Sequence, residues 1–254
     1  NAIAPTSDIT VLCHPYMSEV LASSKYNYLV HESLNHELFL KKELLDDHPL
    51  SEKLLEQTKT VESKSCIESD LIISVSDDDH KGLKSYIENE EKQIVTIKNG
   101  VDIVTDSIFN EHFSKVKASF NGHTVVLFIG SAHGPNIVSA KYILNDLAVK
   151  LTDCYFVIIG SVCDAISFDI KPANVLLFGR LESDVKNVLY SVADIAINPM
   201  FGGSGSNLKL ADYFSWKLPT ITTEFGARGY DVINNNEAII CNIDDFAKNI
   251  KKLQ

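Results

Sequence analysis

The chain lacks several features that would assign it to a broad class at once. Its 254 residues contain no apolar stretch approaching the length of a membrane span and no visible signal peptide. Positive charge is also scarce, since 23 lysines and arginines against 34 acids give a formal net charge of −11. Nucleic acids and anionic membrane surfaces both attract a basic face, so this balance argues against either as a main partner. We expect a cytoplasmic protein, with peripheral attachment to a membrane left open.

The cysteines lack the spacing of a metal site or a disulfide framework. There are 5 of them, an odd number, and no two form a C-x-x-C pair. Each lies in or beside an apolar run: Cys13, Cys66, Cys154, Cys163 and Cys241. The pattern predicts buried free thiols in a reducing compartment, and neither zinc ligands nor disulfides.

What the chain does contain is an alternation of short apolar runs and helical patterns. Apolar residues make up 45% of the sequence and charged residues 22%, as in soluble globular proteins. Strands are predicted at 9–13, 28–30, 70–75, 94–97, 124–129, 155–159, 174–178, 195–198 and 238–240. One series ends near residue 100, and a second starts near residue 123 after an irregular connector. The alternation predicts an α/β protein with two Rossmann-like, doubly wound parallel-sheet domains, at 1–102 and 103–254.

Acidic residues follow the third predicted strand at Asp77, Asp78 and Asp79. They resemble the D-x-D of metal-dependent transferases, but Ser76 stands directly before them at the start of a helical pattern. A serine followed by acids in the first turn is typical of a helix N-cap. We therefore favour capping, and predict no metal site here.

The stretch that organises the rest of the chain runs from residue 195 to residue 223. A short apolar run is followed by a glycine-serine loop at 202–206, by a helical pattern from Leu208, and by a second apolar run. Glycines allow a ligand to approach the backbone closely, and free amides at a helix start attract anions such as phosphate. The pattern predicts a βαβ unit with an anion site, although an ordinary turn has the same composition.

Residues 203–212 resemble the G-S-G-T-x-L-K-x-L-E signature of retaining glycosyltransferases with the GT-B fold, family 4 (group 1). Other stretches match that family in the same order: 97–102, 128–131 before Pro135 and Asn136, 177–182, and 224–229. Each match alone is weak, whereas together they cover the chain from about residue 8. The resemblance identifies the chain as a member of this family, and implies the GT-B arrangement of two Rossmann-like domains.

The resemblance also implies what the domains bind. The C-terminal domain would hold a nucleotide-diphosphate sugar, and the N-terminal domain an acceptor (a glycan, a lipid-linked molecule or a protein), with no cofactor and no obligatory metal. The implied donor-binding residues are Gly130, Ser131, Gly160, Arg180, Leu181, Gly203, Ser204, Gly205, Ser206, Asn207, Leu208, Lys209 and Asp212.

Particular roles follow for some of these residues. The diphosphate would lie on the amides of Asn207 and Leu208, with Lys209 as a catalytic counter-charge. Asp212 would bind the ribose hydroxyls, and backbone groups of Arg180 and Leu181 would meet the base. The alternatives are a solvated helix carboxylate for Asp212 and an ordinary loop cation for Arg180.

His31 ends an N-terminal strand where the family often has a histidine near the reacting sugar, which implies a catalytic role. A histidine that caps the following helix is the alternative for this residue.

Three departures from the family pattern affect the functional prediction. Ser204 replaces the first acid of the E-x₇-E pair, and Ser131 and Asn136 replace a basic pair in the first donor loop. The strands and glycine loop that normally precede the stretch at Ile9 are not present in the sequence, so the N-terminal domain looks incomplete. We therefore expect an N-terminally truncated fragment, or a second chain that completes this domain.

The leading hypothesis is a glycosyltransferase that moves a sugar from a nucleotide-diphosphate sugar to an acceptor hydroxyl with retention and without a metal. The alternative is a non-catalytic GT-B-like partner subunit that stabilises or assists a transferase, which the substitutions at Ser131, Asn136 and Ser204 favour. A 2-epimerase on the same fold would need a cluster of acid/base carboxylates and histidines, which the sequence does not show.

Overall fold

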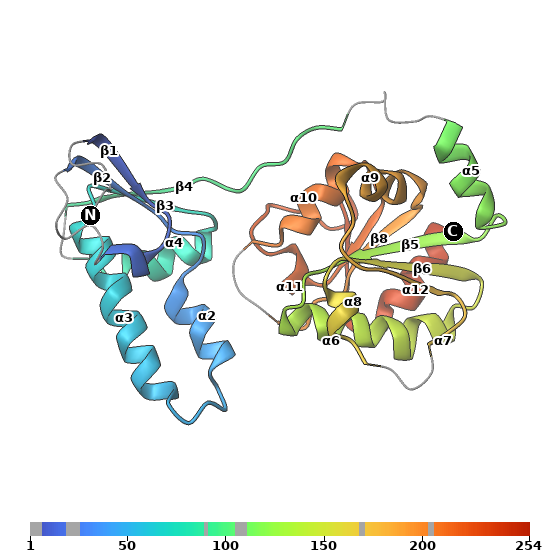
Figure 1. Ribbon diagram of the computed structural model, residues 1–254, viewed down its shortest axis with the longest axis horizontal. Coiled ribbons are helices and arrows are strands. Elements are labelled where there is room, and N and C mark those ends of the chain that lie inside the picture. The colour runs from blue at the N-terminus through green and yellow to red at the C-terminus, as the bar shows by residue number, and fades with distance from the viewer. Residues whose placement is uncertain (1–6, 19–25, 89–90, 105–110, 168–170, 203–205) are drawn as a thin grey trace. The chain divides into compact units, whose positions relative to one another are not determined.

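The computed structural model describes residues 7–18, 26–88, 91–104, 111–167, 171–202 and 206–254, and every structural statement concerns these residues (Figure 1). The chain divides into two compact units. The first is built mainly from Asn1–Asn99, and the second from Gly100–Gly202, Asn207–Ala227 and Asp231–Gln254. The division at residue 99/100 lies close to the boundary predicted at 102/103.

The first unit, blue to cyan in Figure 1, contains a parallel sheet of four strands. In sheet order these are β1 (Ser7–Leu12), β2 (Tyr26–Glu32), β3 (Leu71–Ser74) and β4 (Gln93–Thr96). Its helices are η1 (Pro15–Met17), α2 (Glu37–Leu44), α3 (Ser51–Glu68) and α4 (Asp77–Lys84). Cys66 of α3 and Leu83 of α4 bury their side chains with Ile72 of β3, which fixes these helices to the sheet.

The acidic run at the start of α4 is a helix cap, as predicted. The Ser76 hydroxyl accepts a hydrogen bond from the Asp79 amide at 3.1 Å and donates to the Asp79 carboxylate. The other oxygen of that carboxylate accepts from the His36 amide at 2.8 Å. The Asp79 carboxylate therefore forms hydrogen bonds both at the start of α4 and with the residue before α2. Among the described residues, no group of three or more His, Cys, Asp or Glu side chains is arranged to hold a metal ion.

The second unit, green to red in Figure 1, contains a parallel sheet of six strands in the order β10-β9-β8-β5-β6-β7. The strands are β5 (Thr124–Ile129), β6 (Cys154–Ile159), β7 (Val175–Phe178), β8 (Ile195–Asn198), β9 (Thr220–Thr222) and β10 (Ile239–Ile240). The helices are α5 (Glu111–Ser119), α6 (Gly134–Tyr142), the π-helical η3 (Ile143–Leu147), α7 (Ala148–Lys150), α8 (Val162–Ala165), α9 (Ser183–Val192), α10 (Leu208–Ser215), α11 (Glu224–Ala227), η4 (Ile243–Asp245) and α12 (Phe246–Leu253).

Strand β5 shows why this sheet is covered on both faces. Successive side chains of a strand point to opposite faces, and all four central residues of β5 are apolar and buried. Val126 and Phe128 pack with α6, η3 and α12, whereas Val125 and Leu127 pack with α5, α9 and α10. The second unit is therefore a doubly wound, Rossmann-like fold, as the alternation of apolar runs predicts.

One prediction about local structure is wrong. Residues 111–119 form helix α5, not an irregular connector, because Phe113, Val116 and Phe120 share one face and pack against the second unit's core. Lys117 fixes this helix further, since its Nζ lies 2.6 Å from Oδ2 of Asp194.

The cysteines are all free, but they are not all buried. Cys66 and Cys154 are buried and Cys163 and Cys241 are partly exposed, whereas Cys13, just after the end of β1, is exposed. Among the described helices, none combines the length and the apolar character that a bilayer crossing requires.

Candidate functional site

The order of strands in the second sheet identifies where a ligand would bind. The chain winds outward from β5 through β6 to β7, and then returns to β8 on the other side of β5. In open parallel sheets, ligands bind beyond the carboxyl ends of the strands at the point where the winding direction reverses. The segments after β5 and β8, together with the start of α10, therefore form the candidate site.

Gly130, directly after β5, and Gly160, directly after β6, let the two strand ends pass close together. Gly160 has φ +104°, and a Cβ on it would collide with the Gly130 carbonyl oxygen. The Gly130 amide donates to the Ile159 carbonyl at 2.9 Å, and its carbonyl accepts from the Val162 amide at 3.1 Å. These predicted donor-site glycines thus shape the loop, and the Gly130 amide is already used within the protein.

Lys209, in the first turn of α10, is the cation of the site. Its Nζ donates to the side-chain oxygen of Asn136 at 2.7 Å and lies 3.6 Å from the sulfur of Met200. The same nitrogen lies 4.7 Å from the centre of the Phe128 ring. Among the described residues, no carboxylate lies within ion-pair distance of Lys209.

Burial of this nitrogen has an electrostatic consequence. Removing an ammonium group from water disfavours its charged form, and burial lowers the pKa of Lys209 from 10.5 to about 7. A ligand anion at this nitrogen would supply the missing negative charge and favour the protonated form. The site therefore has the chemistry of an anion-binding pocket.

Asn136 connects Lys209 to the loop after β5. While its oxygen accepts from Lys209, its nitrogen donates to both the carbonyl and the hydroxyl of Ser131 at 3.2 Å. Asn136 and Ser131 occupy the positions at which the family resemblance led us to expect two cations. The structure brings these two residues together with Lys209 in one hydrogen-bonded group.

The start of α10 provides a second feature suited to an anion. Asn207 occupies the N-cap position, but no side chain caps this helix end among the described residues. The Asn207 side chain instead donates to the Phe225 carbonyl at 3.3 Å. The amides of Leu208 and Lys209 lie at the positive end of the helix, and no side chain of the described residues accepts a hydrogen bond from them. Gly203, Ser204 and Gly205, predicted to contact the donor, lie outside the described residues.

Asp212 lies one turn further along α10 and is partly exposed. Its Oδ2 accepts a hydrogen bond from the Tyr190 hydroxyl at 3.3 Å, and the Tyr190 ring stacks on Trp216 with ring centres 5.5 Å apart. This contact orients the carboxylate while leaving acceptor capacity on the second oxygen.

The structure records no contact of the remaining predicted donor residues with Lys209, Asn136 or Ser131 among the described residues. Arg180 is exposed after β7, and Leu181 packs its side chain against the core. Ser206 is partly exposed just before α10.

The first unit contains one predicted catalytic residue, His31. His31, at the end of β2, has no exposed surface, and its Nδ1 lies 3.3 Å from the Leu12 carbonyl. Burial lowers the pKa of His31 to about 4, so the ring is neutral. The alternative, that His31 caps the next helix, is wrong because Glu62 accepts from the first amides of α2. A catalytic role for His31 stays a prediction, and in this structure the ring is enclosed by protein.

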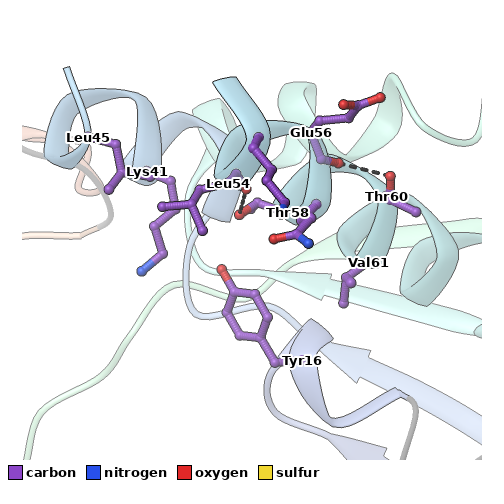
Figure 2. Close-up of a pocket in the computed structure, with 10 residues that line it drawn as sticks. Tyr16, Lys41, Leu45, Leu54, Glu56, Thr58, Thr60 and Val61 are labelled. Carbon is purple, nitrogen blue, oxygen red and sulfur yellow. Dashed lines mark hydrogen bonds between the residues drawn. The ribbon is translucent and has the colours of Figure 1, made fainter. Parts of the chain in front are cut away.

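Cavities also occur elsewhere among the described residues, and two of them are large enough for a ligand. One, of about 850 Å³, lies in the first unit between α2 and α3, where Tyr16 points towards Leu54 and Thr58 (Figure 2). Another, of about 520 Å³, lies at the ends of β9 and β10 beside Thr223 and Asn242. Neither contains a buried cation without a counter-charge, so the group around Lys209 remains the best candidate.

A sequence comparison bears directly on this site. The profile of the family described as glycosyl transferases group 1 matches residues 123–254, which is more than half of the chain. The chain belongs to this family. The match contains the loop after β5, Lys209 and Asp212, so the family assignment rests on the same unit as the candidate site. No curated protein matches the sequence.

Solved structures of glycosyltransferases share the fold. A UDP-forming α,α-trehalose-phosphate synthase from Burkholderia xenovorans is 13% identical, with a TM-score of 0.65 over 96% of this chain and 65% of that one. Anabaena HepE in complex with UDP is 13% identical, with a TM-score of 0.67 over 96% of this chain and 68% of that one. The sucrose-phosphate synthase of Thermosynechococcus elongatus is 13% identical, with a TM-score of 0.67 over 96% of this chain and 64% of that one.

These likenesses show the GT-B type of α/β fold, with Rossmann-like parallel sheets. The chain spans 65% of the length of the trehalose-phosphate synthase that it matches.

The sequence alone did not identify the residues that contact the Lys209 nitrogen or hold the segment after β8 in place. Met200 and Phe128 surround the Lys209 nitrogen, and Thr223 donates to the Met200 carbonyl at 2.8 Å. Asn198, fully buried at the end of β8, donates to the Gly226 carbonyl at 2.9 Å and so connects the segment after β8 to α11. A polar residue at the end of an otherwise apolar strand was the one available signal for Asn198.

Proposed function

We propose that this chain transfers a sugar from a nucleotide-diphosphate sugar to an acceptor hydroxyl, with retention and without a metal ion. The observation that carries the proposal is a buried lysine nitrogen without a carboxylate partner, next to a helix start that no side chain caps. Both features lie beyond the carboxyl ends of parallel strands, where such folds bind nucleotides. Membership of the glycosyl transferases group 1 family supports a sugar nucleotide as the ligand.

In this proposal the diphosphate is the leaving group, and the protein stabilises the charge that develops on it. When the anomeric bond breaks, negative charge builds on the diphosphate, which the α10 amides and Lys209 would face. Preorganised donors aimed at developing charge are the largest single contribution in many enzymes. The acceptor hydroxyl would then attack on the same face of the sugar. No side chain of the site stands out as a covalent nucleophile.

Asp212 would hold the nucleotide rather than take part in bond breaking. Its partly exposed carboxylate, oriented by Tyr190, suits a pair of ribose hydroxyls. A charge-assisted hydrogen bond of this kind contributes about 1.5–3 kcal/mol. That corresponds to roughly ten- to a hundredfold in donor affinity.

Calorimetric titration tests the donor site. We expect one of UDP, GDP, ADP or the corresponding sugar nucleotides to bind with a micromolar dissociation constant, and Asp212→Ala to weaken this binding at least about tenfold. Asp146→Ala is the matched control. Asp146 lies on η3 and pairs with Lys150 of α7, which is not a residue of the candidate site. Absence of binding across the whole panel would refute the proposal.

Addition of a chelator tests independence from metal. The proposal expects unchanged donor turnover with EDTA present, since the described residues hold no cluster of metal-binding side chains. Loss of turnover that Mg²⁺ or Mn²⁺ restores would contradict it.

A non-catalytic partner subunit is the second candidate. The neutral pair Ser131 and Asn136, at positions where we expected cations, favours it because fewer positive charges then face the leaving group. Donor binding without hydrolysis or transfer, when a glycan, lipid-linked or protein acceptor and any completing second chain are supplied, would select this reading. The first unit would hold the acceptor in either case.

A further inference from the structure

Asn136 makes a contact that neither the proposed activity nor the family assignment explains. A carboxylate would be the usual partner for a buried lysine, whereas here a neutral amide oxygen lies 2.7 Å from Nζ of Lys209. The amide cannot rotate freely, because its nitrogen donates to the carbonyl and hydroxyl of Ser131 at 3.2 Å. The Lys209 nitrogen is therefore held in a defined place by a residue that contributes no charge.

Among the described residues, no charged side chain is recorded in contact with this nitrogen. The Phe128 ring faces it from β5, Met200 faces it from the segment after β8, and Asn136 faces it from α6. None of these side chains titrates. On its own helix, Asp212 is bonded to Tyr190, and burial alone lowers the pKa of Lys209.

We propose that Asn136 positions the Lys209 nitrogen to receive a diphosphate, and that Lys209 takes up a proton when the diphosphate binds. This inference rests on the proposed function, and it adds a positioning residue and a proton to it. Asn136 holds the nitrogen in place without supplying a competing negative charge. The incoming diphosphate then provides the only strong counter-charge, and the proton comes from solvent.

Proton uptake makes donor binding depend on pH in a predictable direction. Lys209 is largely neutral above pH 7 in the free protein, so binding there requires a proton and becomes weaker as pH rises. We expect affinity to fall by up to about tenfold for each pH unit above 7, until the pKa of the bound state is reached. Below pH 6 the lysine is already charged, and this dependence disappears.

Nuclear magnetic resonance tests the first half of the inference without any ligand. We would follow the ¹⁵Nζ shift of Lys209 against pH, assigning the signal with a Lys209→Met variant. The wild-type protein should titrate near pH 7, whereas Asn136→Asp should restore a midpoint close to the ordinary lysine value of about 10.4. Asn145→Asp, an exposed change on η3, should leave the midpoint where it was. An ordinary midpoint in the wild type would overturn the inference.

Calorimetry with a nucleotide sugar tests the second half. A nucleotide sugar is the suitable probe because its diphosphate has no ionisation near pH 7. At pH 8, heats measured in buffers of different ionisation enthalpy should reveal uptake of about one proton per bound donor. Asn136→Asp should remove most of this uptake and weaken binding at least about tenfold, since its carboxylate would repel the diphosphate. Asn145→Asp should keep both the uptake and the affinity.

The possible results separate this inference from the proposed function. Donor binding without proton uptake at pH 8 would overturn the inference and leave the proposed function standing. If Lys209 titrates near pH 7 but no sugar nucleotide binds, the proposed function fails and the coupling fails with it.

Discussion

At Gly160 the chain turns away from β6 so close to the Gly130 carbonyl that no side chain fits between them. The residue adopts φ +104°, a backbone conformation that L-amino acids with side chains rarely take. Its amide is shared between the Phe178 and Gly179 carbonyls, both at 3.0 Å, so the backbone cannot shift easily.

We predict that Gly160→Ala destabilises the second unit by about 2–4 kcal/mol, because strain from positive φ and the collision with Gly130 add together. Gly179→Ala is the matched control, since a Cβ there would meet only Asp164 at 3.9 Å and the residue needs no positive φ. Urea unfolding monitored by tryptophan fluorescence measures both variants. Equal stabilities for the two would show that the close approach costs nothing.

The resemblance to the glycosyltransferase family singled out Lys209 and Asp212 as candidates, because the helix that carries them follows a glycine loop in the pattern of that family. It could not reveal that Asn136 would be the partner of Lys209. That contact joins residues 73 positions apart, and it depends on how β5 and β8 lie beside each other. The resemblance likewise implied a catalytic His31, whereas the structure leaves its side chain with no exposed surface.

At the scale of elements, α2 is capped by a neighbouring helix and not by its own sequence. Glu62 of α3 accepts from the Glu37 amide at 2.6 Å and the Leu38 amide at 3.2 Å, and from the Tyr86 hydroxyl at 2.9 Å. Its side chain is fully buried. Burial outweighs these hydrogen bonds and raises the pKa of Glu62 from 4.5 to about 7.

This cap predicts a dependence of stability on pH. Between pH 4.5 and 7 the folded protein keeps a proton on Glu62 that the unfolded chain has released. The contribution of Glu62 to stability is therefore complete below pH 4.5 and is lost as pH rises to 7, by a total of about 3 kcal/mol. Glu62→Gln should lose this slope, since its amide oxygen can still accept from α2.

Urea unfolding of the first unit at several pH values, followed by circular dichroism, measures this slope. Glu68→Gln, an exposed change on the same helix, should retain the wild-type dependence. His36 lies 3.5 Å from Glu62, and burial lowers its pKa from 6.5, so the comparison is made between variants and not within one curve. A wild-type slope that Glu62→Gln leaves intact would assign the effect to another group.

Most elements were predictable because their apolar periodicity is strong. The strand β5, at 124–129, was predicted with its observed bounds, since a buried parallel strand is an uninterrupted apolar run. Helix α5 was missed because its apolar positions are few, and its packing against the core and its ion pair between Lys117 and Asp194 join residues that are far apart in sequence. Tertiary contacts of this kind have no local signature.

At the scale of the whole molecule, each unit has its own sheet and its own buried core. The single tryptophan of the chain, Trp216, packs against the core of the second unit. Its fluorescence therefore reports on the second unit alone, whereas circular dichroism reports on both.

We predict that thermal unfolding followed by these two probes gives transitions that do not coincide, and that a donor nucleotide shifts the fluorescence transition together with only that part of the circular dichroism change that belongs to the second unit. At a ligand concentration of 100 times the dissociation constant, the second unit should gain about 2.7 kcal/mol. A tryptophan-free protein, Trp216→Phe, serves as the blank for the fluorescence signal. Coincident transitions that move together with nucleotide would instead indicate one cooperative unit.

The strand order of the second sheet also has a consequence for the chain while it is being synthesised. Strands β5, β6 and β7 can pair as soon as residue 178 has emerged, but the other flank of β5 must wait for β8 at Ile195–Asn198. During that interval an apolar strand presents unpaired backbone groups to its surroundings, the arrangement from which misassembly starts. Rapid pairing of β8 with β5, once helix α9 has formed, would shorten this interval and reduce aggregation of the nascent protein.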